Sequence, residues 1–196
     1  MKKHLKLAFI TLACTNLLMA DMVFNLGAQQ FSNSVEGNFK DSTYELDKTI
    51  VSTALKFDKG HYISDGSGSF KVELKEPQPK WGVTFDMNSY LYDRGLGVTL
   101  LGKEGQVLTL FFSYGEISVD GKVIEDNTFG REETIVGSLE SNGAGVTVVI
   151  NGKHSFKIDK SNFKLAYIEI NLGNESHGAQ YYPDQLNGLA ISTKLD

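Results

Sequence analysis

Residues 146–158 read VTVVINGKHSFKI, and this stretch decides the fold. Two runs of alternating apolar and polar residues flank Asn151 and Gly152, a dipeptide that strongly favours a tight β-hairpin turn. Successive side chains of a strand point to opposite faces, so each run has an apolar face and a more polar one. The stretch predicts two antiparallel strands with one buried face.

The register of this hairpin follows from the need to bury its apolar residues together. A two-residue loop would mix core and solvent residues on each face. A three-residue loop, with Gly152 in the left-handed region, brings the apolar residues to one face. The predicted pairs are Val148 with His154 and Val146 with Phe156.

Turn signals of Gly, Asn, Asp and Pro recur every 8–15 residues along the chain, between runs rich in Val, Ile, Phe, Tyr and Thr. Asp120 and Gly121 predict a second hairpin. Residues 81–92 alternate between apolar and polar positions, whereas residues 107–112 and 163–172 are candidates for central strands. This spacing is typical of an all-β sandwich or barrel with antiparallel strands.

The first 20 residues have the pattern of a signal peptide: a basic start, then a short apolar run. We expect cleavage after Ala20, which leaves residues 21–196 as a single domain in the periplasm or outside the cell. Residues 11–14 also resemble a bacterial lipobox, although Thr11 stands where Leu is usual. In that alternative the protein is anchored by a lipid on Cys14.

Cleavage after Ala20 removes the one cysteine, so the mature domain depends on a hydrophobic core rather than on disulfides. It also leaves 16 of the 19 basic residues against 24 acidic ones, a formal charge of −8. Nucleic acids and anionic membranes are therefore not expected as partners, because both require clustered Lys and Arg. No later segment is apolar enough to suggest a membrane span.

The order of these features resembles the concanavalin A-like, or laminin-G-like, jelly-roll superfamily. The likeness is carried by residues 54–60 (ALKFDKG), the strand at 81–88, the Asn-Gly hairpin, residues 165–172 and residues 184–191 (DQLNGLAI). It implies a jelly-roll β-sandwich of two curved antiparallel sheets. Members of the superfamily bind glycans, bind proteins, cleave polysaccharides or serve as structural modules, so the fold leaves the function open.

Enzymes with this jelly roll carry Glu-x-Asp-x-x-Glu on one central strand. The nearest match is residues 169–174, EINLGN, in which Glu169 is present but Asn171 and Asn174 replace the other two acids. Retaining glycosidases need two carboxylates about 5–5.5 Å apart, and an amide cannot transfer the proton. The sequence therefore favours a non-catalytic domain, with a divergent lyase or hydrolase as the lesser alternative.

No cofactor is expected. The histidines of the mature chain, His61, His154 and His177, are far apart and lack the spacing of a zinc site. His154 falls at a core-facing position of its hairpin, which favours a structural role. The loop after Asp65 has one acid, although calcium held by side chains from separate loops stays open.

Polar and aromatic residues face away from the predicted core on two strands, and Tyr has the apolar body and polar tip that suit a binding surface. They would converge in one groove if residues 81–92 and 163–172 share the concave sheet. Otherwise they are ordinary solvent-facing residues. The loop at 177–184 is a second candidate. The candidate ligand-binding residues are Asp86, Asn88, Tyr90, Tyr92, Tyr167, Glu169, Asn171, Tyr181 and Tyr182.

The favoured function is an exported glycan- or polysaccharide-binding module, because the aromatic-polar face suits sugars and the catalytic acids are absent. The alternative is a protein-interaction or adhesion module whose partner is a protein of the cell envelope.

Overall fold

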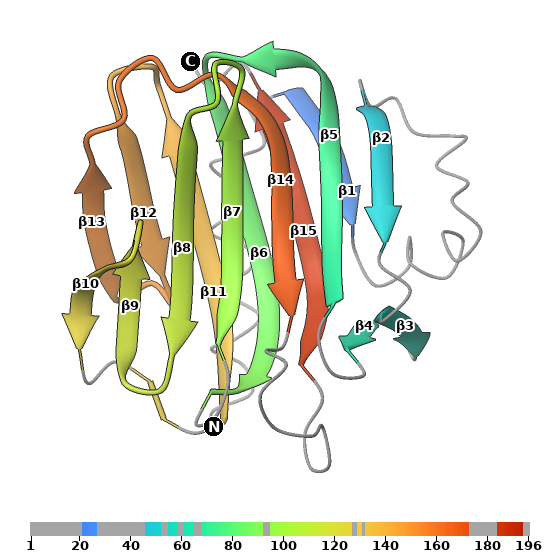
Figure 1. Cartoon of the computed structure of the whole chain (residues 1–196), viewed down its shortest axis with the longest axis vertical. Helices are drawn as coiled ribbons and strands as arrows, with labels where there is room; N and C mark the ends of the chain where they lie inside the picture. Colours follow the sequence, from blue (N-terminus) through green and yellow to red (C-terminus); the bar gives the residue numbers. More distant parts are fainter. Residues whose placement is uncertain are drawn as a thin grey trace.

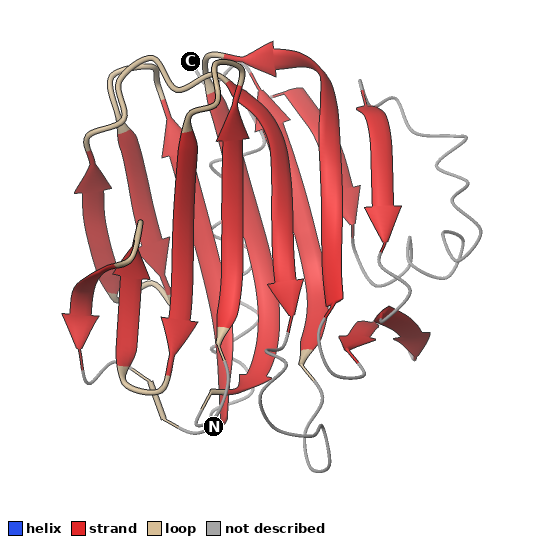
Figure 2. Cartoon of the chain, viewed as in Figure 1, coloured by secondary structure: helices blue, strands red, loops and turns tan. Residues whose placement is uncertain are grey.

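A computed structural model describes residues 21–26, 46–51, 55–58, 61–64, 68–91, 95–126, 129–130, 132–172 and 184–193. The predicted export segment 1–20, with Cys14, lies outside these residues. Across the described ranges there are strands and loops and no helix (Figure 2). No helix long and apolar enough to cross a membrane occurs in this part of the chain.

The strands form two antiparallel sheets that lie face to face, the seven-stranded one in front in Figure 1. The seven-stranded sheet has the order β10(Lys122–Asp126), β9(Glu116–Val119), β8(Val107–Ser113), β7(Leu96–Gly102), β14(Leu165–Leu172), β5(Gly68–Gln78), β2(Leu46–Val51). The eight-stranded sheet has the order β13(His154–Ile158), β12(Val146–Ile150), β11(Glu132–Ser141), β6(Trp81–Tyr90), β15(Gln185–Thr193), β4(His61–Ser64), β3(Leu55–Asp58), with β1(Asp21–Leu26) also paired to β15. The predicted fold class, an antiparallel two-sheet β-sandwich, is confirmed.

The core lies between the sheets because alternate residues of each strand point inward. On β6 the buried residues are Val83, Phe85 and Met87, as their alternation predicts. Phe85 meets Phe112 of β8 at a ring-centroid distance of 5.9 Å, which joins the two sheets. Burial of such apolar surface is the main stabilising contribution to the domain.

Trp81 makes a second link between the layers. Its indole Nε1–H donates to the Phe163 carbonyl at 3.1 Å, and the two rings lie 5.8 Å apart. Both side chains are fully buried. A buried indole N–H needs an acceptor, and this one is supplied by the loop that leads into β14.

The hairpin that joins β12 and β13 has the predicted three-residue loop, with Gly152 at φ 65°. Its register differs from the prediction by two residues: Val148 pairs with Phe156, and Ile150 with His154. The predicted pairs would leave only one residue at the tip, which cannot close the turn. A shift of two keeps every side chain on the same face, so burial alone does not distinguish the two registers.

Both predicted hairpin turns attach to a third strand in the same way. The Asn151 N–H donates to the Val136 carbonyl at 2.7 Å, and its Oδ1 accepts from the Val136 N–H at 2.8 Å. Asp120 makes the equivalent pair of bonds to Thr109, each at 2.9 Å. Both turn residues have a positive φ, which Asn and Asp tolerate better than most residues. These turns therefore fix the register of three strands at once.

The Asn151→Ala variant should lose about 1–3 kcal/mol of unfolding free energy, because it places Ala at a positive φ and removes two side-chain hydrogen bonds. These are the bond that Oδ1 accepts from the Val136 N–H and the bond that Nδ2 donates to the Thr134 carbonyl at 3.1 Å. Asn151→Asp keeps the acceptor for Val136 and should lose less. Chemical denaturation of both variants tests this account. Equal stability of Asn151→Ala and the wild type would contradict it.

Gly137 of β11 has no room for a side chain, because an added Cβ would overlap the ring of Phe85. Overpacking a tight core costs about 1–3 kcal/mol, so Gly137→Ala should lower the unfolding free energy by this amount. Gly97→Ala is the matched control, since its Cβ would lie 3.5 Å from the Asn171 Cβ, an ordinary contact. Thermal unfolding of the pair should separate them; similar melting temperatures would refute the steric account.

Candidate functional site

The predicted ligand-binding residues do not form one groove. Asp86 and Asn88 belong to β6 in the eight-stranded sheet, whereas Tyr167, Glu169 and Asn171 belong to β14 in the seven-stranded sheet. Outward-facing residues of two packed sheets point in opposite directions. The condition for one shared groove, that the two strands lie in the same sheet, is therefore not met, and the outer face of each sheet is a separate candidate.

On the eight-stranded sheet, Asp86 and Asn88 bond to the neighbouring strand β15. The Asn187 Nδ2 donates to Asp86 Oδ1 at 2.9 Å, and the Asn88 Nδ2 donates to Gln185 Oε1 at 3.4 Å. Asn88 Oδ1 and Asn187 Oδ1 are buried and accept no hydrogen bond from the described residues. This face therefore uses its polar side chains mainly to join two strands.

The remaining aromatic candidates are not placed. The backbone of Tyr90 ends β6, but its side chain lies outside the described part of the structure, as do Tyr92, Tyr181 and Tyr182. Of the predicted loop at 177–184, only Asp184 is described. It is fully buried, and its Oδ1 accepts a hydrogen bond from the Ser89 hydroxyl.

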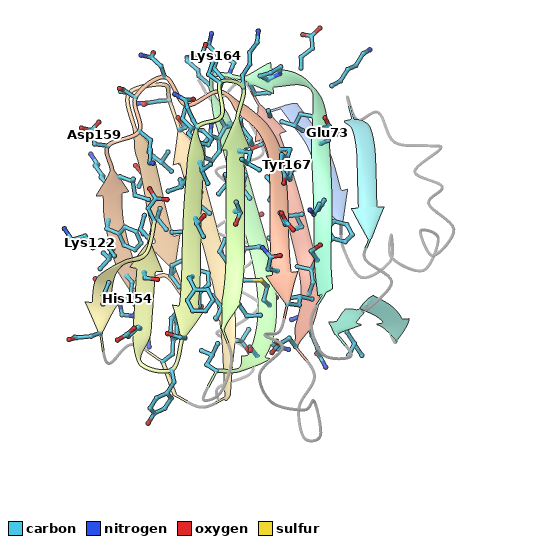
Figure 3. All side chains as sticks on the ribbon, viewed as in Figure 1. Glu73, Lys122, His154, Asp159, Lys164 and Tyr167 are labelled. Atoms are coloured by element: carbon cyan, nitrogen blue, oxygen red, sulfur yellow. The ribbon has the colours of Figure 1, made fainter. Side chains whose placement is uncertain are left out.

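On the seven-stranded sheet, the carboxylate of Glu169 is held from both sides. Lys71 of β5 lies 3.0 Å from Oε1, and the Tyr167 hydroxyl donates to Oε2 at 3.2 Å. Tyr167 pairs across the strands with Glu73, and Figure 3 shows these two residues near each other on β14 and β5. The register thus brings a cation, a phenol and a carboxylate together at the surface.

Two pKa shifts reflect this arrangement. The hydrogen bond from the Lys71 ammonium to Glu169 raises the pKa of Lys71, whereas burial lowers this pKa to a smaller extent. Burial raises the pKa of the Tyr167 hydroxyl, and the negative charge of Glu169 adds to the rise. Lys71 therefore remains a cation and Tyr167 a neutral donor across the physiological range.

Beside this cluster, Gly97 of β7 leaves the sheet without a side chain between Asn171 and Phe111. Asn171 pairs with Gly97, and Gly97 pairs with Phe111 of β8. The ring of Phe111 lies over Gly95, where an added Cβ would overlap it, yet the residue is 38% exposed. The result is an aromatic ring and an amide on either side of Gly97, which is itself buried.

Phe111 was not among the predicted site residues. The prediction that residues 107–112 form a central strand holds, since β8 has neighbours on both sides. The outward-facing Val107 and Phe111 are nonetheless exposed. Apolar residues on both faces of this strand therefore do not mean that both faces are buried. The sequence did contain a signal for Phe111: it is an aromatic residue on the strand face opposite to the core residues Leu108, Leu110 and Phe112. Apolar patches that remain exposed mark contact surfaces.

One row of outward-facing residues crosses six strands of this sheet, and strands lie about 4.8 Å apart, so the row extends for roughly 24 Å. We call the outward-facing residues Asn171, Gly97, Phe111, Thr99, Tyr167 and Glu169 the β14–β7–β8 face. From β5 to β10 the row consists of Ser69, Asn171, Gly97, Phe111, Ser118 and Val123.

The titratable groups of the described residues offer little catalytic machinery. Glu169 is the one carboxylate on the outer side of β14, and both of its oxygens are already engaged. Within the described ranges no three His, Cys, Asp or Glu side chains gather where they could share a metal ion. His154 lies 3.5 Å from Glu125 of β10, where it links the edges of the two sheets, in keeping with the predicted structural role.

Solved structures with the same fold have very different sequences. A sialidase aligns at 10% identity and TM-score 0.53 over 71% of this chain, which spans 16% of the sialidase. The β-glucanase of Bacillus licheniformis aligns at 10% identity and 0.52, covering 80% of this chain and 95% of its own. A legume lectin-like domain from Entamoeba histolytica aligns at 12% identity and 0.51, covering 74% and 90%.

These likenesses show that the chain has the concanavalin A-like jelly-roll fold, as the sequence pattern predicted. No protein-family model matches the chain, and no curated protein does. Function must therefore be argued from the two outer faces.

The free energy of unfolding should fall as the pH rises above about 10. Lys71 and Tyr167 have folded pKa values above their ordinary 10.5 and 10.0, so the unfolded chain loses these protons first. Tyr167→Phe should make the fall shallower. Denaturation from pH 8 to about 11.5 measures the slopes; identical slopes for Tyr167→Phe and the wild type would contradict the assignment.

Proposed function

We propose that this protein binds carbohydrate on the β14–β7–β8 face and does not turn it over. The observation that carries the proposal is the exposed ring of Phe111, which lies over Gly95, with the amide of Asn171 across Gly97 on the same face. Sugars combine apolar C–H faces with hydroxyl groups. An aromatic ring contacts the former, while Asn171, Thr99 and Glu169 supply acceptors and donors for the latter.

The shared fold is consistent with this proposal but does not carry it. A potassium-bound carbohydrate recognition domain of Emp46p aligns with 74% of this chain at TM-score 0.51, with 8% identity. Because the same jelly roll also occurs in the β-glucanase and the sialidase, the absence of turnover needs its own argument. That argument is the single carboxylate of β14, whose oxygens contact Lys71 and Tyr167 rather than a second acid.

Export is part of the proposal. The basic start and apolar run of residues 1–20 support secretion with cleavage after Ala20, or anchoring through Cys14 in the alternative. A glycan-binding domain in the periplasm or outside the cell would meet polysaccharides directly. Mass determination of the mature protein from its host distinguishes the two forms, because lipidation adds acyl chains to Cys14.

A second candidate function is binding of a cell-envelope protein. Val123 and Ile124 lie exposed on β10, the edge strand of the seven-stranded sheet. Exposed apolar residues at a sheet edge suit pairing with a partner. Val123→Lys with Ile124→Lys would abolish capture of such a partner from envelope extracts, while binding of sugar at Phe111 would depend much less on these residues.

Phe111→Ala should weaken glycan binding about tenfold. The apolar surface that the stacked ring buries contributes roughly 1.4 kcal/mol to the binding free energy. The matched control is Tyr114→Ala, which removes a 49% exposed aromatic side chain from the turn after β8. Both variants and the wild type are compared on an array of neutral and acidic oligosaccharides. The proposal fails if the wild type binds none of them, or if Phe111→Ala binds as well as Tyr114→Ala.

A further inference from the structure

The outer side of strands β14, β7 and β8 carries very little charge. Glu169 is its one ionised side chain; every other outward position is neutral. Those positions are Tyr167, Asn171, Gly97, Thr99, Leu101, Val107, Thr109, Phe111 and Ser113. A ligand on these strands would therefore meet Glu169 and the cation that accompanies it, while a second ion pair, Lys160–Asp120, lies at 2.8 Å beside the Val107 end of β8.

That cation, Lys71, is already neutralised. Its Nζ lies 3.0 Å from Glu169 Oε1, and its side chain keeps 34% of its exposure. The Tyr167 hydroxyl, the other strong donor nearby, is directed at Glu169 Oε2. An anionic ligand is bound most strongly by charged donors, and the cation of this cluster is already held by the protein's own carboxylate.

One further carboxylate, that of Glu73, lies directly beside this cluster, and Glu73 pairs in turn with Lys48 of β2. Glu73 is exposed and pairs directly with Tyr167, and the whole chain has a formal charge of −5. Lys75 lies farther along β5, at the irregularity where β5 and β14 lose register. Hydroxyl groups, in contrast, can donate to Glu169, since a carboxylate has about four lone-pair sites and two are in use.

We infer that the Lys71–Glu169–Tyr167 cluster makes this face selective for uncharged sugars and excludes uronate- and sialate-type acidic ones. The inference rests on the proposed function and names its substrate class. Glu169 acts as a selectivity residue: it accepts hydrogen bonds from sugar hydroxyl groups and also cancels the charge of Lys71. Removing its charge should convert the face into one that attracts anions.

The test compares neutral hexasaccharides (cellohexaose, laminarihexaose, mannohexaose) with acidic ones of equal length (hexagalacturonate, hexaguluronate) by calorimetric titration at low salt. The wild type should bind at least one neutral probe and bind the acidic probes at least tenfold more weakly. Glu169→Gln should shift the acidic-to-neutral affinity ratio about fivefold to tenfold toward the acidic probes, the effect of one freed surface charge. Adding Lys71→Met should cancel the shift, as should about 1 M salt.

Each outcome bears on a different claim. If the wild type binds acidic probes as tightly as neutral ones, or Glu169→Gln leaves the ratio unchanged, the selectivity inference is overturned while carbohydrate binding stands. If neither class binds, the proposed function fails and the inference fails with it. Should Glu169→Gln not fold, Lys71→Gln must move the ratio in the opposite direction, and no movement overturns the inference.

Discussion

Phe85 of the eight-stranded sheet and Phe112 of the seven-stranded sheet meet at 5.9 Å, and the rest of the structure depends on this apolar contact between layers. Packing of the two sheets around this contact requires alternate residues of every strand to point inward. The residues between them lie on the outer faces. Phe129 extends the cluster at 6.0 Å from Phe112. Because the described strands of both sheets obey this constraint, their outer faces point in opposite directions.

Glycines adjust both surfaces of the sheets to large aromatic rings. Gly137 gives room to Phe85 inside the core, and Gly95 gives room to Phe111 outside it. The internal pair contributes to stability, whereas the external pair holds an exposed ring in a defined place. A rigid ring costs little conformational entropy on binding, which suits it to ligand contact. In both places a glycine makes room for an aromatic ring, which serves core packing at Phe85 and the proposed binding face at Phe111.

Alternation in the sequence was enough to predict the fold class, the two hairpins and the faces of β6 and β14. It was not enough to assign strands to sheets, because β14 lies between β5 and β7, which come much earlier in the chain. For this reason the sequence left open whether Asp86 and Asn88 share a face with Glu169. The hairpin register failed similarly, since a shift of two residues leaves every side chain on its predicted face. Phe111 was missed because an apolar strand was interpreted as buried on both sides.

The central claim is that ligand binds the seven-stranded face, around Phe111 and Glu169, rather than the face of Asp86 and Asn88. A crystal structure of the protein with the most tightly bound neutral hexasaccharide tests this most directly. The account predicts a sugar ring stacked on Phe111, with hydroxyl groups at Asn171 and Glu169. A sugar bound instead on β6 and β15, or density confined to the edge strand β10, would contradict it.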